Sequence, residues 1–111
     1  RCMAAANVAV EEEIYDKVKE VMLEVAKSVK VGNAVDESTY MGPVISPGAI
    51  ARIHNYIDIG LEEGCTLLLD GRNPELPEEF KNGYFIAPTI LEGVTPDMRV
   101  AKEEIFGPVF P

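Results

Sequence analysis

Two thiols are the first candidates for chemistry in this chain, which contains Cys2, Cys65 and a single histidine, His54. A cysteine thiolate is a strong nucleophile, and the thioester that it forms passes on its acyl group readily. A cysteine can equally be a small, buried, apolar residue. No Cys-x-x-Cys or Cys/His spacing indicates zinc, and two cysteines do not make a disulfide scaffold. By residue type alone, Cys2 is either a nucleophile or a core residue.

Cys65 and His54 are weaker candidates for chemistry than Cys2. Cys65 follows Gly64 and opens an apolar stretch, so we expect it in the core. His54 follows Ile53 within a helical pattern, where a histidine is usually at the surface or hydrogen-bonded in the core. A cysteine-dependent hydrolase would need a base near Cys2, and His54 has no visible partner to orient it. This hydrolase remains an alternative.

A second group of candidates lies near the end of the chain, in residues 102–108. The two candidates within it are the carboxylate of Glu104 and the aromatic ring of Phe106. Gly107 and Pro108 predict a sharp turn that would orient both side chains. By residue type alone, Glu104 would be a solvated charge and Phe106 a core aromatic. Glu103 is expected to be solvated or salt-bridged.

The composition limits the kinds of partner. With 19 acidic and 10 basic residues, the 111-residue chain carries a net charge of −9. Nucleic acids and anionic membranes bind basic surfaces, so neither is an expected partner. No apolar run approaches the roughly 20 residues that a membrane-spanning helix needs. The length suits one domain with a modest core.

Two long helices are predicted. The first begins at the acidic residues 11–13, where negative charge favours a helix start, and it ends at Gly32. Its apolar residues follow helical spacing: Ile14, Val18, Val21, Met22, Val25 and Val29. The second begins with Ser46 as N-cap and Pro47 as the first helical residue, and Gly64 ends it. Its expected buried face is Ile50, Ile53, Ile57 and Leu61.

Short strands are expected at residues 7–10, 66–69, 83–91 and 98–101, with an exposed loop at 72–83. The apolar residues 109–111 resemble a strand cut short, and the first residue is arginine rather than methionine. We therefore expect both ends to lie within a longer protein. A buried strand directly after a helix favours parallel pairing. The predicted class is α/β: a parallel-sheet layer with two main helices, in a single domain spanning 1–111.

Several stretches, in order, resemble the aldehyde dehydrogenase superfamily. Residues 1–4 (Arg-Cys-Met-Ala) resemble the second half of its Gly-Gln-x-Cys nucleophile signature. Residues 102–109 resemble its Glu-Glu-Ile-Phe-Gly-Pro motif in full. Residues 41–45 and 83–90 match between these two. The resemblance covers essentially the whole chain, and the glutamate motif is highly specific.

This resemblance implies oxidation of an aldehyde with NAD, or NADP, as cofactor. Cys2 would attack the aldehyde to form a thiohemiacetal, and loss of hydride to the nicotinamide would leave a thioester. Water or CoA would then take the acyl group. Glu104 would bind the hydroxyls of the nicotinamide ribose, and Phe106 would pack beside the nicotinamide. No metal is implied. Residues 1–3 and 67–72 are most similar to the CoA-acylating methylmalonate-semialdehyde branch, which suggests methylmalonate or malonate semialdehyde as substrate.

The family places its dinucleotide-binding domain, oxyanion asparagine and general-base glutamate before the cysteine. The resemblance thus implies a partial catalytic domain, inactive and without useful NAD affinity when isolated. The parent enzyme would be a homodimer or homotetramer in the cytoplasm, or in the mitochondrial matrix of a eukaryote. A non-catalytic interaction module with the same fold is the second alternative.

Overall fold

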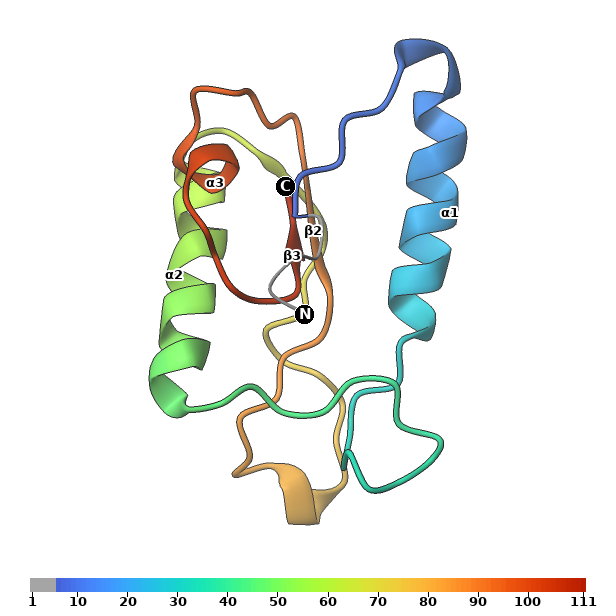
Figure 1. Ribbon diagram of the computed structural model, residues 1–111, viewed down its shortest axis with the longest axis vertical. Helices are drawn as coiled ribbons and strands as arrows, with labels where there is room; N and C mark the ends of the chain where they lie inside the picture. The colour runs from blue at the N-terminus through green and yellow to red at the C-terminus, as the bar shows by residue number, and fades with distance from the viewer. Residues whose placement is uncertain (1–5) are drawn as a thin grey trace.

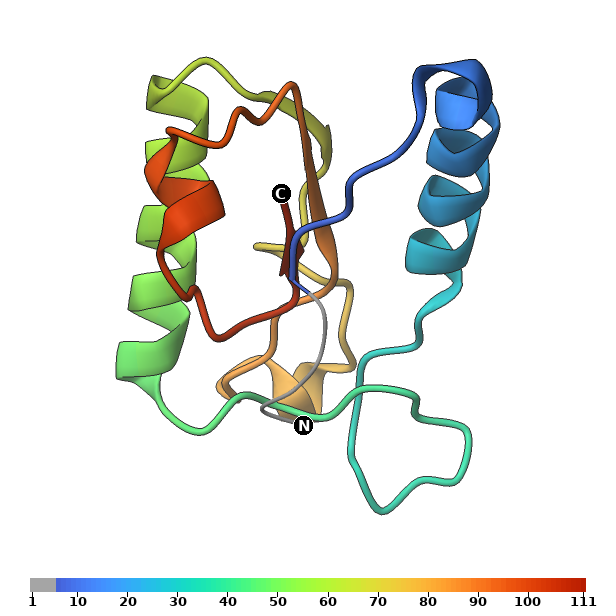
Figure 2. The same cartoon turned by 45° about the horizontal axis from the view of Figure 1, so that its top comes forward.

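The computed structural model describes residues 6–111, in which two helices lie on opposite sides of a small sheet (Figure 1). Helix α1 (Tyr15–Ser28) follows a 3-10 turn, η1 (Glu12–Ile14), and helix α2 (Pro47–Glu62) lies across the sheet from it. The same separation is visible from a second direction in Figure 2. The predicted α/β class with two main helices is confirmed.

The sheet is mixed. Its strands β1 (Thr66–Leu69), β2 (Thr89–Glu92) and β3 (Val109–Phe110) lie in that order. Strands β2 and β3 are parallel, as expected, whereas β1 and β2 are antiparallel. The reason is the connection between β1 and β2, which contains only the 3-10 turn η2 (Glu78–Phe80). Without a crossover helix, the chain returns in the opposite direction.

Helix α2 begins and ends as the sequence predicts. The Ser46 hydroxyl accepts a hydrogen bond from the Ala49 N–H at 3.1 Å, and Pro47 is the first helical residue. Gly64 follows the helix with a φ of +100°, a left-handed conformation that glycine adopts without steric cost. The buried face differs from the prediction: Leu61 is 37% exposed, and Ile50 is only partly buried.

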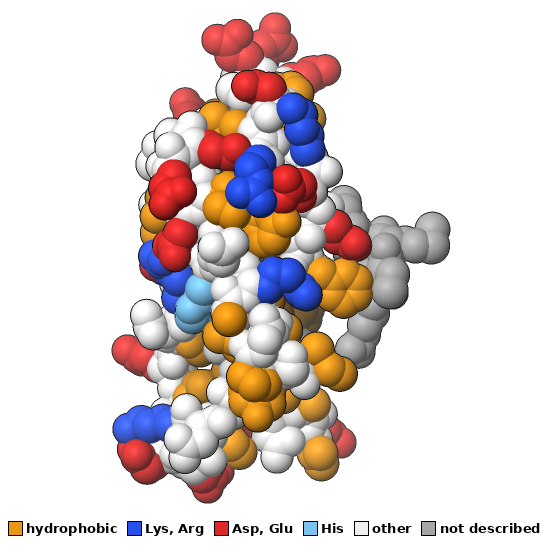
Figure 3. Space-filling model, turned by 90° about the vertical axis from the view of Figure 1, so that its left-hand side faces the viewer, with side chains coloured by type: hydrophobic (Ala, Val, Ile, Leu, Met, Phe, Trp, Pro, Cys, Tyr) orange, Lys and Arg blue, Asp and Glu red, His pale blue; other side chains and the backbone are white. Residues whose placement is uncertain are grey.

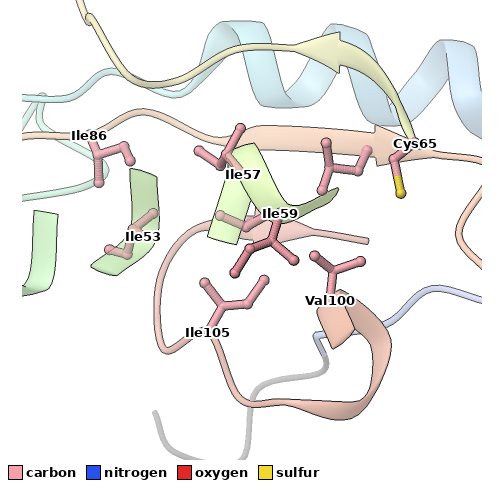
Figure 4. Packing of buried hydrophobic residues seen from close by; sticks show 9 residues of the cluster. Ile53, Ile57, Ile59, Cys65, Ile86, Val100 and Ile105 are labelled. Atoms are coloured by element: carbon pink, nitrogen blue, oxygen red, sulfur yellow. The ribbon is translucent and has the colours of Figure 1, made fainter. Parts of the chain in front are cut away.

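The core lies between α2 and the sheet and continues under a short helix, α3 (Arg99–Lys102) (Figure 4). Ile59, which sequence periodicity did not place in the core, is buried there with Val100 and Ile105 because α3 and the following segment cover this side of α2. The buried members of the cluster are Ile53, Ile57, Ile59, Cys65, Ile86, Leu91, Val100, Ile105 and Val109.

Helix α1 has the predicted apolar stripe, but that stripe is poorly covered. Val21 is 51% exposed and Val25 is 58% exposed. A hollow of about 420 Å³ separates these side chains from β2 and β3, and a second of about 540 Å³ lies toward residues 7–10. A polar link joins α1 to the sheet: Tyr15 and Lys19 both donate hydrogen bonds to the Glu92 carboxylate.

Three strand predictions need correction. Residues 7–10 form no strand, and the Val8 N–H only reaches the Pro111 carbonyl at 3.5 Å. Within 83–91, pairing as a strand begins at Thr89, because the Ala87 N–H donates to the Gly71 carbonyl in a loop. Residues 98–101 fall largely in helix α3 instead. There the Glu63 carboxylate accepts from the first backbone N–H groups of the helix, which stabilises its start.

Candidate active site

The predicted nucleophile, Cys2, lies outside the residues that the structure describes. The remaining predicted contacts, Glu104 and Phe106, follow α3 on a segment that leads into β3. Between them, Ile105 is only 6% exposed and belongs to the core, whereas Glu104 and Phe106 are both exposed. The buried Ile105 thus fixes the backbone while its two neighbours remain accessible.

Phe106 has an unusual backbone conformation. Its φ is +55°, in the left-handed region that non-glycine residues rarely adopt, and its side chain is 59% exposed. The alternative that Phe106 is a core aromatic is therefore wrong. A left-handed conformation costs roughly 1–2 kcal/mol for a residue with a Cβ atom. Such strain persists only where the surroundings enforce it, and it is common at functional sites.

The surroundings of Phe106 come from α2. The Arg52 Nε donates to the Ile105 carbonyl at 3.1 Å, and its Nη2 donates to the Phe106 carbonyl at 3.3 Å. Next to them, a Cβ atom on Gly107 would lie 2.6 Å from the Ile53 side chain, so the turn packs directly on the helix. One turn of α2 therefore contacts three consecutive residues of the motif.

Glu103, on the other side of Glu104, forms a polar cluster. Its carboxylate accepts hydrogen bonds from Arg99 at 3.0 Å and from the Tyr56 hydroxyl at 2.6 Å. These bonds, the Arg99 bonds first, lower the pKa of Glu103 from 4.5 to about 2. The prediction of a salt-bridged Glu103 is confirmed. By contrast, the Glu104 carboxylate forms no hydrogen bond or ion pair with any of residues 6–111.

The remaining candidates show little sign of catalytic activation. Cys65 is 7% exposed, and burial raises the pKa of its thiol, so the prediction of a core cysteine is confirmed. His54 is partly buried on α2, and its Nε2 has no hydrogen-bond partner in the described part of the chain. Within residues 6–111, His54 therefore lacks one of the hydrogen bonds that we expect of a histidine in the core. A base oriented by a partner, as a hydrolase requires, is not formed at His54 within residues 6–111.

The side of the molecule that carries α2 has a mixed surface, with acidic and basic side chains interspersed among apolar ones (Figure 3). Within residues 6–111 no group of three or more His, Cys, Asp or Glu side chains is arranged to hold a metal ion. The helices of that same part are too short or too polar to cross a membrane.

Sequence reasoning did not single out Arg52 and Tyr56. Their spacing of four residues places them on one side of a predicted helix, and this was the only available signal. Their partners lie 53 and 47 residues away along the chain, at Ile105 and Glu103. Helical periodicity cannot reveal contacts at such separations.

Comparison with known proteins shows what this chain is similar to. Residues 1–111 match the Aldehyde dehydrogenase family. The malonate-semialdehyde dehydrogenase of Listeria monocytogenes serotype 4a (strain HCC23) is 49% identical over 109 residues, which cover 98% of this chain and 22% of that protein. The D-glyceraldehyde dehydrogenase (NADP(+)) of Picrophilus torridus is 44% identical over 108 residues, covering 97% of this chain and 22% of that protein.

A solved structure shares the fold. It is the putative methylmalonate-semialdehyde dehydrogenase of Sinorhizobium meliloti 1021 complexed with NAD, with a TM-score of 0.92 and 40% identity. The match covers 99% of this chain and 22% of that one. The chain thus spans about a fifth of the length of these relatives. The family match over all 111 residues and the shared fold lead to one conclusion: the chain belongs to the aldehyde dehydrogenase family.

Proposed function

We propose that this chain is part of the catalytic domain of an NAD(P)-dependent aldehyde dehydrogenase, and that another part of the polypeptide supplies the dinucleotide-binding domain. In this proposal Cys2 is the nucleophile, and Glu104 and Phe106 contact the cofactor. The relatives' names favour malonate or methylmalonate semialdehyde as the substrate.

The observation that carries this proposal is the arrangement around Ile105. Burial of that side chain fixes the backbone, so Glu104 and Phe106 extend into solvent from a defined position. The Glu104 carboxylate uses none of its acceptor capacity on residues 6–111, and a carboxylate can accept from both hydroxyls of a ribose. The exposed Phe106 ring can pack beside a planar nicotinamide. These residues therefore fit the cofactor that the family uses.

The thiol would perform the covalent step. The Cys2 thiolate adds to the aldehyde carbon, and the carbonyl oxygen becomes the oxyanion of a thiohemiacetal. A nicotinamide cofactor, when bound, would supply the hydride acceptor for this carbon, and a thioester would then remain on Cys2. Attack by CoA or water on the thioester carbon then regenerates the thiol. The exposed Glu104 and Phe106 would hold the acceptor ring against the reacting carbon, and such positioning contributes strongly to rate.

The test uses the complete subunit and three variants: Cys2→Ala, Glu104→Gln and Phe106→Leu. With malonate semialdehyde, NAD and CoA, the Cys2→Ala variant should release no NADH, either in a first-turnover burst or in steady state. Glu104→Gln should raise the KM for NAD roughly tenfold, because an amide replaces a charged acceptor. The same assay without CoA shows whether turnover requires CoA or whether water can take the acyl group.

The matched controls are Cys65→Ala and Glu79→Gln. Cys65 is the other cysteine, and Glu79 is exposed and forms no hydrogen bond or ion pair within residues 6–111. Both control variants should have the same KM for NAD and the same first-turnover burst of NADH as the unsubstituted enzyme. Full activity of Cys2→Ala would refute the assignment of Cys2 as the nucleophile. An unchanged KM for NAD in Glu104→Gln would refute the contact between Glu104 and the cofactor. The isolated 111-residue chain should produce no NADH, since the proposal places the dinucleotide-binding domain outside it.

A further inference from the structure

We propose that Arg52 and Tyr56 of α2 are positioning residues, which set where Glu104 and Phe106 meet the cofactor. Arg52 holds backbone carbonyls after Glu104, and Tyr56 holds the Glu103 side chain before it. This inference rests on the proposed function, in which those two residues contact NAD. Neither Arg52 nor Tyr56 needs to touch the cofactor in order to act in this way.

Arg52 acts on the side that follows Glu104. Its guanidinium donates to two consecutive carbonyls, those of Ile105 and Phe106, at 3.1 and 3.3 Å. The guanidinium donors are fixed in one plane, so two simultaneous bonds constrain the orientation of both peptide groups. The second of these peptide groups follows the left-handed residue Phe106. Arg52 therefore stabilises the one backbone conformation that would otherwise relax.

Tyr56 acts on the side that precedes Glu104. Its hydroxyl donates to Glu103 at 2.6 Å, and Arg99 donates to both carboxylate oxygens of the same residue. Tyr56 lies one helical turn after Arg52, and Ile53 between them is fully buried. The two contacts thus come from one face of a helix that the core holds in place. Glu104 is the residue between the two held positions.

A purely stabilising role makes a different prediction. Exposed ion pairs and hydrogen bonds contribute little to the free energy of unfolding. If Arg52 and Tyr56 only stabilised the fold, their loss would lower the melting temperature slightly and leave the KM for NAD unchanged. If they position Glu104, the KM for NAD changes while the KM for the aldehyde stays nearly constant. The two kinetic constants therefore separate these roles.

The experiment compares Arg52→Met and Tyr56→Phe in the complete subunit with two matched controls, Arg72→Met and Tyr40→Phe. Arg72 forms ion pairs only with Asp58 and Asp70 within residues 6–111, and Tyr40 is 85% exposed. We expect Arg52→Met to raise the KM for NAD about tenfold and Tyr56→Phe to raise it severalfold, because small displacements of a bound group are costly. The controls should retain the KM for NAD.

A second comparison repeats Arg52→Met in a Glu104→Ala background. Residues that act through one another are non-additive, so Arg52→Met should then raise the KM for NAD by clearly less than it does in the original subunit, and the remaining effect would arise through Phe106. Arg52→Lys keeps the charge but loses the planar pair of donors, and we expect about half of the logarithmic effect. If Arg52→Met does not fold, Arg52→Lys carries the test.

Two outcomes would overturn this inference without touching the proposed function. In the first, Glu104→Ala raises the KM for NAD but the Arg52 variants leave it unchanged. In the second, Arg52→Met raises the KM for NAD by the same factor whether or not Glu104 is present. An unchanged KM for NAD in Glu104→Ala would overturn the proposed cofactor contact and this inference with it. The single variant at Glu104 thus distinguishes the two failures.

Discussion

The hydroxyl of Tyr56 donates a 2.6 Å hydrogen bond to the carboxylate of Glu103, and so joins the middle of α2 to the residue just before Glu104. The bond raises the pKa of Tyr56 and helps to lower that of Glu103. Tyr56 therefore remains the donor, and Glu103 the charged acceptor, across the physiological pH range.

The first prediction concerns acid stability. The pKa of Glu103 falls from 4.5 to about 2 on folding, so its contribution to stability is present above pH 4.5 and is lost as the pH falls toward 2. In Glu103→Gln, urea-unfolding midpoints should decline less between pH 4.5 and 2 than in the unsubstituted chain. Glu79→Gln is the control and should retain the original slope. An identical decline in Glu103→Gln and the original chain would contradict the prediction.

The second prediction tests the contact between the motif and α2. In Gly107→Ala, the new Cβ would lie 2.6 Å from the Ile53 side chain, which is fully buried, so the packing around it must shift. Overpacking of this kind costs about 1–3 kcal/mol of unfolding free energy. Chemical denaturation measures it, and Gly48→Ala, where the nearest atom is 3.7 Å away, is the control.

The same contact can be checked by a double substitution. Ile53→Ala leaves a cavity and should destabilise the chain by about 2–5 kcal/mol. The Cβ of Gly107→Ala would partly fill that cavity. The double variant should therefore be more stable than the sum of the two single effects predicts. Strict additivity would show that Gly107 and Ile53 are not in contact.

The third prediction concerns the attachment of α1. The Glu92 carboxylate accepts from Tyr15 at 2.8 Å and from Lys19 at 2.9 Å. In Glu92→Ala, amide hydrogen exchange within α1 should accelerate severalfold, because α1 loses its two hydrogen bonds to this charged carboxylate and opens more readily. Exchange in α2 should not change. Glu20→Ala, on the exposed side of α1, is the control, and equal exchange in both variants would refute the attachment.

The fourth prediction concerns Cys65. Its burial and, to a lesser extent, the charge of Glu63 raise the pKa of the thiol, so less thiolate is present than at an ordinary cysteine. Its sulfur also lies 3.6 Å from that of Met98. Alkylation of Cys65 at pH 8, followed by peptide mass spectrometry, should be at least tenfold slower in the folded chain than in urea. Equal rates would show that the thiol is accessible. The same digests report on Cys2.

Local signals predicted local structure well. Ser46, Pro47 and Gly64 located both ends of α2, because a cap is formed by residues next to one another. For residues 98–101 the same approach predicted a strand, which was wrong. Their helix begins where Glu63, 36 residues away, accepts the backbone N–H of Arg99, and this contact is set by tertiary packing.

In the candidate site, too, local features could be predicted from the sequence and tertiary contacts could not. The family resemblance predicted roles for Glu104 and Phe106 from a contiguous motif. It gave no indication of the left-handed φ at Phe106 or of the Arg52 side chain that bonds to its carbonyl. Those features depend on how α2 lies against the motif, and residue spacing along one segment contains no such information.

The backbone at Phe106 also bears on how this protein could be engineered or could evolve. Stability alone would favour glycine or asparagine there, since both tolerate a left-handed φ and the exposed ring contributes little to the core. A search for thermostabilising substitutions would therefore rank position 106 highly. If the ring serves the cofactor, such a search would exchange turnover for thermal tolerance, and directed-evolution libraries should leave this codon unchanged.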